Sequence, residues 1–282
     1  METILVPVDF SKTSDHAAKY ALRIAQQIGN CRLLLLHTVR VGYYETILPS
    51  VDYTQYGDED IQRMHRSLLK KLNNLKDRLS SLCGKHLPID ISIEEGSLLA
   101  IINEINAHEK PFLVIIGSNG SSDLNDRVLG TNTIRIAKTS TKPVLVVPPN
   151  AMFKPVEKVV LACDFRKITE LIPVDSLKTI VKTFGAKLEV LNVNPKGEQL
   201  KEDLLQEQGL LDQMLNDLDH EYQFTSNRNV AEGILEYAHD SKAQIIISLP
   251  RKYSFFESIL HDSISTKLTF RSDKPVLLLR AY

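Results

Sequence analysis

The stretches ILVPVDFS (residues 4–11) and VVLACDFR (159–166) are two apolar runs of one chain that each end in Asp-Phe. Later segments match in the same order: LLLLHTV (33–39) with LEVLNVN (188–194), and KPVLVVP (142–148) with KPVLLLR (274–280). An ordered internal repeat of this kind indicates a duplicated structural unit. The 282 residues are also enough for two ordinary domains. We therefore predict tandem domains at 1–149 and 150–282.

The two copies differ in length. Asp9 and Asp164 are 155 residues apart, whereas Pro143 and Pro275 are 132 apart, so the second copy lacks 23 residues. We predict that they are lost from the region matching about 40–85 of the first copy. The proline-marked segment 148–158 has no hydrophobic periodicity and is predicted to be the linker.

Continuous apolar runs such as LLLL and FLVII are typical of parallel strands buried on both faces of a sheet. Because they alternate with helical patterns, they predict βαβ units. In the first copy we expect strands at 3–8, 32–39, 88–93, 112–117 and 143–147, and helices at 13–28, 59–83, 97–108 and 131–140. The predicted fold class is α/β, with two tandem open parallel five-stranded sheets and helices on both faces.

Ligands of such sheets bind beyond the carboxyl ends of the strands, where the strand order reverses. After the fourth strand comes GSNGSSDLNDRVLGTNT (117–133). Gly117 and Gly120 predict a backbone that approaches a ligand closely and takes positive φ. Gly130 opens a helix, whose free amides favour a phosphate. Such a loop can also be only a turn, but its place after a central strand favours the phosphate site.

The spacing Gly117-x2-Gly120-x9-Gly130-Thr resembles the ATP-binding signature of the universal stress protein family. The pattern P-x-D-x-S (7–11) and the end of the fold at KPVLVVP (142–148) resemble that family too. The resemblance covers nearly the whole chain, as a tandem. It implies a Rossmann-like, adenine-nucleotide-binding sheet with strand order 3-2-1-4-5.

The resemblance also implies roles for individual residues. Asp9 would accept hydrogen bonds from ribose hydroxyls. The adenine would be lined by the backbone at Pro7 and Val8 together with Thr38, and the sugar and α-phosphate would be flanked by Ile116 and Gly117. The phosphate loop would comprise Asn119, Gly120, Gly130, Thr131, Asn132 and Thr133.

The implied cofactor is ATP with Mg²⁺, bound in the first copy of a stress-response or signalling protein that acts through nucleotide-dependent contacts with a partner. A slow ATPase and an interaction protein that binds no nucleotide are the alternatives. In the family, strands equivalent to 143–147 and 275–280 pair two copies. Here they predict an intramolecular pseudo-dimer, and a homodimer of chains is left open.

The second copy has lost the three glycines of the signature. Leu249, Lys252 and Asp262 stand at their positions, and an aspartate at a helix start would repel a phosphate. Asp164 is retained. We predict that the second copy does not bind ATP in the same way, and that it is a structural half or holds a different ligand.

Nothing in the sequence points to efficient catalysis. It has no Gly-x4-Gly-Lys-[Ser/Thr] loop and no evident general base, so we expect slow ATP hydrolysis at most and assign no catalytic residue. A phosphoryl-accepting role for Asp9 lacks the second carboxylate of an Asp-x-Asp motif. We interpret His37 as a packed histidine, and we predict no metal site made by side chains.

The formal net charge of -1 gives no reason to expect nucleic-acid binding or a basic membrane-binding patch. Cys31, Cys83 and Cys163 are scattered, which is typical of a reducing compartment. The N-terminus leads directly into a predicted strand, and no apolar run approaches the ~20 residues of a membrane span. We expect a cytoplasmic protein.

Overall fold

The computed structural model describes residues 1–39, 58–83, 87–118, 133, 135, 136, 139–197, 202–250 and 264–280. Of the helix predicted at 131–140, residues 133, 135, 136 and 139 are described and helical. The other predicted elements of the first copy agree with the structure to within two residues at each end.

The first half alternates strands and helices in the predicted order. Its strands are β1 (Glu2–Pro7), β2 (Cys31–Val39), β3 (Ile89–Glu95), β4 (Leu113–Gly117) and β5 (Val144–Val147). Its helices include α1 (Lys12–Ile28), α2 (Asp58–Ser81) and α3 (Leu98–His108).

The second half repeats the arrangement. Its strands are β6 (Lys158–Ala162), β7 (Lys187–Asn194), β8 (His220–Ser226), β9 (Ile245–Ser248) and β10 (Val276–Leu278). Its helices are α5 (Ile168–Leu171), α6 (Val174–Phe184), α7 (Glu202–Met214), α8 (Val230–Asp240) and α9 (Ile264–Arg271). The shortening falls between the second and third strands as predicted, since α2 has 24 residues and α7 has 13.

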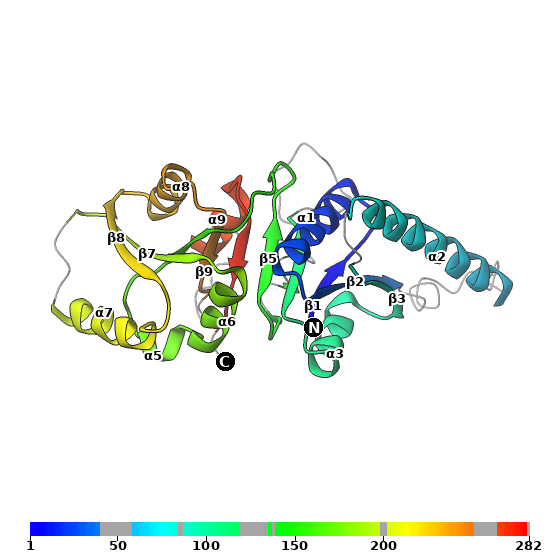
Figure 1. Cartoon of the computed structure of the whole chain (residues 1–282), viewed down its shortest axis with the longest axis horizontal. Helices are drawn as coiled ribbons and strands as arrows, with labels where there is room; N and C mark the ends of the chain where they lie inside the picture. The colour runs from blue at the N-terminus through cyan, green and yellow to red at the C-terminus, as the bar shows by residue number, and fades with distance from the viewer. Residues whose placement is uncertain are drawn as a thin grey trace, which may run out of the picture.

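The two halves share one ten-stranded sheet with the order β3-β2-β1-β4-β5-β10-β9-β6-β7-β8. Each half has the predicted order 3-2-1-4-5, and neighbours within a half are parallel. The halves meet through an antiparallel pair, with Leu277 of β10 opposite Leu145 of β5. Figure 1 shows β5 and the red C-terminal strand at the centre, between the two halves. The expected intramolecular pairing of terminal strands is therefore confirmed.

Helices cover both faces of this sheet, and each face has a continuous apolar core. One core contains Ile4, Val6 and Leu35 with residues of α1, α2 and α6. The other contains Leu5 and Leu36 with residues of α3 and α8. Neighbouring strand residues alternate between the two cores, which explains why the strand sequences are apolar throughout.

The linker between β5 and β6 is packed against both halves. Gln27 at the end of α1 accepts a hydrogen bond from the Val156 amide at 2.8 Å and donates to the Val156 carbonyl at 2.9 Å. It also donates to the carbonyl of Phe184 at the end of α6 (3.3 Å). The linker residue Phe153 packs edge-on against Tyr20 of α1. A single glutamine side chain thus ties the linker to a helix of each half.

Candidate functional site

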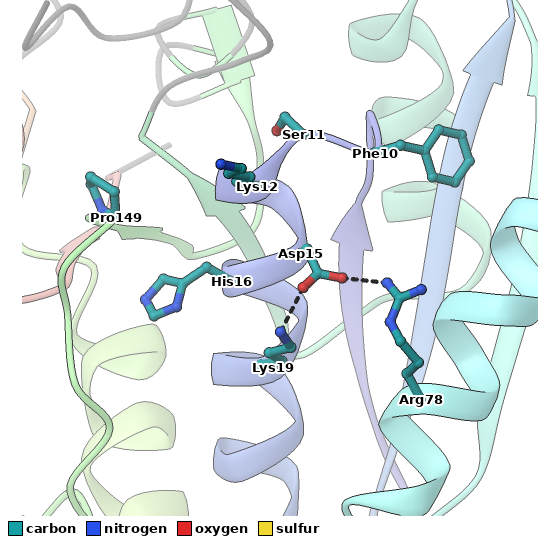
Figure 2. A pocket seen from close by; sticks show the side chains of 8 residues that line it. All are labelled: Phe10, Ser11, Lys12, Asp15, His16, Lys19, Arg78 and Pro149. Carbon is teal, nitrogen blue, oxygen red and sulfur yellow. Dashed lines mark hydrogen bonds and ion pairs between the residues drawn. The ribbon is translucent and has the colours of Figure 1, made fainter. Parts of the chain in front are cut away.

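The turn from β1 to α1 is held in a strained backbone conformation. Phe10 has a φ of 62°, in the left-handed region that bulky residues rarely occupy. Such a conformation costs about 1–3 kcal/mol and persists where surrounding contacts impose it. Ser11 follows as the N-cap of α1, and its hydroxyl accepts a hydrogen bond from the Ser14 amide at 3.1 Å. Figure 2 shows Phe10 and Ser11 at this turn, above the first turns of α1.

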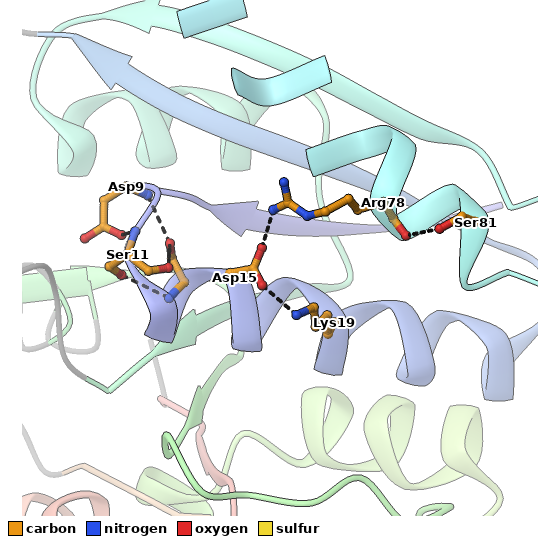
Figure 3. A network of polar contacts seen from close by, with 7 residues as sticks. Asp9, Ser11, Asp15, Lys19, Arg78 and Ser81 are labelled. Atoms are coloured by element: carbon orange, nitrogen blue, oxygen red, sulfur yellow. Dashed lines mark hydrogen bonds and ion pairs between the residues drawn. The ribbon is translucent and has the colours of Figure 1, made fainter. Parts of the chain in front are cut away.

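Asp9 lies at the apex of the same turn with its side chain exposed to solvent. Its Oδ1 atom accepts a hydrogen bond from the Ser11 amide at 2.9 Å, and its own amide lies 3.4 Å from the Ser14 hydroxyl (Figure 3). Partial burial acts to raise the pKa of Asp9, but hydrogen bonds from Ser11 and Ser14 outweigh it and lower the pKa below 3.8. The side chain is therefore a carboxylate at neutral pH, and it can accept further hydrogen bonds.

The sheet register brings the predicted residues of three strands to one edge. Pro7 lies opposite Leu36, so Asp9 lies level with Thr38. On the other side of β1, Leu5 lies opposite Val114, which places Val8 level with Gly117. The strand order reverses between β1 and β4, the point at which open α/β sheets bind ligands. Pro7, Val8, Asp9, Thr38, Ile116 and Gly117 therefore lie together, as the sequence predicted.

Gly117 is required for close packing. A Cβ atom on this residue would lie 2.9 Å from the carbonyl oxygen of Thr13 in the first turn of α1. Its φ is not positive, so the sequence-based expectation of positive φ is wrong at this position. Its carbonyl accepts a hydrogen bond from the Thr133 hydroxyl at 3.0 Å. The side chain of the buried Thr133 is therefore bonded to the end of β4. This contact is a different role from the phosphate contact that the resemblance implies for Thr133.

The backbone of Val8 already has partners within the sheet. Its amide donates to the Leu36 carbonyl at 2.8 Å, and its carbonyl lies 2.7 Å from Nδ1 of His37. The amide of Val8 is therefore not available to read a base, and the residue is buried in the core. The interpretation of His37 as a packed residue agrees with this hydrogen bond and with its ring contact to Phe10.

Five predicted residues of the phosphate loop lie outside the described residues: Asn119, Gly120, Gly130, Thr131 and Asn132. Their roles stay predictions. Ser14, which the sequence analysis did not single out, bonds both sides of the Asp9 turn. The signal for it was the Ser-x-x-Ser pattern at 11–14, which is an N-cap sequence ahead of an amphipathic helix.

The equivalent region of the second half keeps the turn and changes its surroundings. Phe165 has a φ of 51°, and Asn192 donates to the Cys163 carbonyl at 2.9 Å, as His37 contacts that of Val8. The registers place Leu249 where Gly117 stands. The first amide of α5, on Ile168, donates to the carboxylate of Glu207 from α7 at 2.9 Å.

The described residues hold no group of three or more His, Cys, Asp or Glu side chains that could bind a metal ion. Within the same ranges, no helix has the length and apolar character of a membrane span. Cys31, Cys83 and Cys163 are all free thiols.

Comparison with known proteins identifies the family. The sequence profile of the Universal stress protein family matches residues 1–148, more than half of the chain. This chain belongs to the universal stress protein family. Universal stress protein G of Salmonella typhimurium (strain LT2) is 30% identical over 156 residues, covering 52% of this chain and 98% of that protein. A universal stress protein of Methanocaldococcus jannaschii is 27% identical over 154 residues, covering 51% of this chain and 93% of that protein.

The full-length matches are structural. The crystal structure of a universal stress protein from Archaeoglobus fulgidus DSM 4304 has a TM-score of 0.70 at 17% identity, covering 99% of this chain and 98% of that one. A functionally unknown protein from Pseudomonas aeruginosa PAO1 has a TM-score of 0.61 at 14% identity, covering 100% of this chain and 93% of that one. At these identities the similarity establishes the fold of both halves, that of tandem universal stress protein domains.

Proposed function

We propose that this universal stress protein binds ATP in its first domain (1–149), that its second domain (150–282) does not bind ATP in the same way, and that occupancy governs contacts with a partner. The observation that carries the proposal is the difference at one position of the sheet edge. Gly117 lets the first turn of α1, which follows the Asp9 turn, pack against the end of β4, whereas Leu249 stands at the equivalent position in the second half.

The residues present at this edge fit a nucleoside. Asp9 is an ionised carboxylate on an exposed turn, which suits it to accept hydrogen bonds from ribose hydroxyls. Thr38 is half-buried beside it. We assign the phosphates to the loop at 119–132, on its sequence. The proposed Mg²⁺ would be held chiefly by the phosphates, as is usual for a metal ion bound with a nucleotide.

The first test is native mass spectrometry of the freshly purified protein together with titration calorimetry against ATP and Mg²⁺. We expect one adenine nucleotide per chain. Two nucleotides per chain would contradict the assignment of a silent second domain. No mass shift and no heat would favour the interaction protein without nucleotide, and steady phosphate release would favour the slow ATPase.

A matched pair of substitutions sharpens this test. Asp9→Asn keeps an oxygen that can accept the Ser11 amide, so the turn should persist while the negative charge is lost. We expect ATP affinity to fall by about tenfold or more, the scale of one charge-assisted hydrogen bond. Asp164→Asn makes the same change at the equivalent turn of the second domain and should leave the affinity unchanged. Equal effects of the two variants would overturn the assignment.

A further inference from the structure

A cavity of about 580 Å³ opens beside the β1–α1 turn, on the outer side of α1. It is lined by Phe10, Ser11, Lys12, Asp15, His16, Lys19, Arg78 and Pro149. Figure 2 shows these side chains coming from the turn, the first two turns of α1, α2 and the linker. Its volume lies within the range of about 300–1,000 Å³ that is usual for small-molecule sites.

The charged side chains that line this cavity are mostly cations. Asp15 pairs with Lys19 at 2.7 Å and with Arg78 at 2.6 Å. Partial burial acts to raise the pKa of Asp15, but the bonds from Lys19 and Arg78 lower it further, so Asp15 stays ionised. Lys12 forms no ion pair with any described residue and is exposed at the mouth. One carboxylate therefore balances three cations.

Two further residues, Lys71 and His16, belong to the surroundings of this cavity. Lys71 of α2 lies 5.5 Å from the centre of the Phe10 ring and lines a smaller adjoining cavity that also contains Asp15 and Arg78. His16 also lines the cavity, and its Nε2 atom is buried without a hydrogen-bond partner among the described residues.

The second domain does not repeat this arrangement. Lys12 and Asp15 have counterparts in the exposed pair Lys167 and Glu170, but Lys19 is replaced by Val174 and His16 by Leu171. The cluster is therefore not a by-product of the shared fold. It adjoins the proposed ATP site at the β1–α1 turn, but none of its lining residues is among those predicted to bind ATP.

We propose that this cavity is a second ligand site, which binds the phosphate group of a small phosphorylated molecule. A multiply charged phosphate can engage Lys12, Lys19 and Arg78 together and compete with Asp15, whereas a singly charged anion gains less. The Phe10 ring gives the rest of the ligand an apolar surface to contact. Because Pro149 of the linker forms one wall, a ligand here would touch the connection between the domains.

The test is calorimetric titration of the full chain with inorganic pyrophosphate, without divalent cations, in the presence and absence of saturating ATP. We expect binding in both conditions, and an affinity that falls as salt is raised. The double variant Lys12→Ala with Lys19→Ala should weaken pyrophosphate binding by about tenfold or more, since two charged contacts are removed. Its ATP affinity should stay that of the wild type.

The matched control is Lys167→Ala with Lys182→Ala. Lys167 is the counterpart of Lys12, and Lys182 pairs with Asp217 on the second domain much as Lys19 pairs with Asp15. This control should leave pyrophosphate binding unchanged. Absence of pyrophosphate binding, equal binding by the Lys12 and Lys19 variant, or complete displacement by ATP would each overturn the second site. Failure of ATP to bind would instead count only against the proposed function.

Discussion

In the first domain Gly117 allows α1 to begin against the end of β4, whereas Leu249 stands at that position in the second domain. There the helix corresponding to α1 is broken into α5 and α6 ahead of Val174, and Pro173 stands where α1 has Ala18. Proline removes an amide donor and clashes with the preceding helical turn, which explains the break. The two halves thus keep the same strand order, although the helix that follows the first strand is continuous in one half and broken in the other.

The Asp-Phe turn after the first strand is present in both halves of the protein. Both phenylalanines have positive φ, but Phe165 is fully buried against Tyr222 and Phe224, whereas Phe10 is half-exposed and lines a cavity. The strained turn therefore persists where we propose no ATP site. Its strain alone is not a mark of nucleotide binding.

The largest expected effect concerns the ten-stranded sheet that the two domains share. Leu145 and Leu277 lie opposite each other across the antiparallel junction, and both are buried. Truncating either one to alanine should lower the free energy of unfolding by about 2–5 kcal/mol, the usual cost of a buried leucine. Urea denaturation measures it. A loss at Leu277 far below that at Leu145 would indicate that the junction does not couple the domains.

Next in size is a transplant between the domains, Gly117→Leu, which introduces the residue of the second copy. The added side chain meets the Thr13 carbonyl, so we expect a stability loss of about 1–3 kcal/mol from overpacking, together with loss of ATP binding. Denaturation and calorimetry measure the two effects. Gly209→Leu is the control, because a Cβ at Gly209 meets nothing within 4 Å. Normal ATP affinity in Gly117→Leu would remove the basis for the difference between domains.

A third prediction concerns a polar cluster of the second domain. Buried Glu189 pairs with Lys158 at 2.7 Å and accepts a hydrogen bond from Tyr237 at 2.9 Å. The first domain has Thr3, Leu34 and Ile105 at these positions. Lys158→Met should cost about 1–3 kcal/mol, less than a fully buried pair because solvent reaches Lys158.

Restoring the first-domain set tests the same cluster in the opposite direction. Lys158→Thr, Glu189→Leu and Tyr237→Ile together should give a protein near wild-type stability, since an uncharged and largely apolar set often replaces a buried ion pair without loss. Thermal unfolding compares this variant with Lys158→Met. A triple variant less stable than the single one would mean that the cluster is needed for folding.

The smallest expected effect is a pH dependence. Burial is the main cause that raises the pKa of Cys31 to about 11, from an ordinary value of 9.0. Because the folded-state pKa is the higher one, this contribution to stability is complete below pH 9 and is lost as the pH rises toward 11. By pH 10 the loss should be about 1.4 kcal/mol. Cys31→Ala introduces the residue found at the equivalent position of the second domain, Ala186. This variant should lose that part of the decrease in unfolding free energy when denaturation is measured from pH 8 to pH 10.

Much of this protein was determined by local sequence. The repeat, the parallel strands and the order of elements follow from apolar runs of fixed period, which report burial on one or both faces wherever the strand finally lies. The grouping of Asp9, Thr38 and Gly117 also followed, because carboxyl ends of parallel strands meet at one edge. The sequence also showed that the second copy has no glycine at the position equivalent to Gly117, because the repeat aligns that position with Leu249.

Other features were decided only by the tertiary structure, because they depend on residues distant in sequence. The joining of β5 to β10 into one sheet was expected only from the family resemblance, because no local pattern specifies which edge a terminal strand pairs with. The reason for Gly117 is the carbonyl of Thr13, more than 100 positions earlier in the chain, and not its own φ. The cationic cavity likewise forms only where α1, α2 and the linker meet. Sequence patterns record which groups must be buried, whereas the packed fold decides which distant groups then become neighbours.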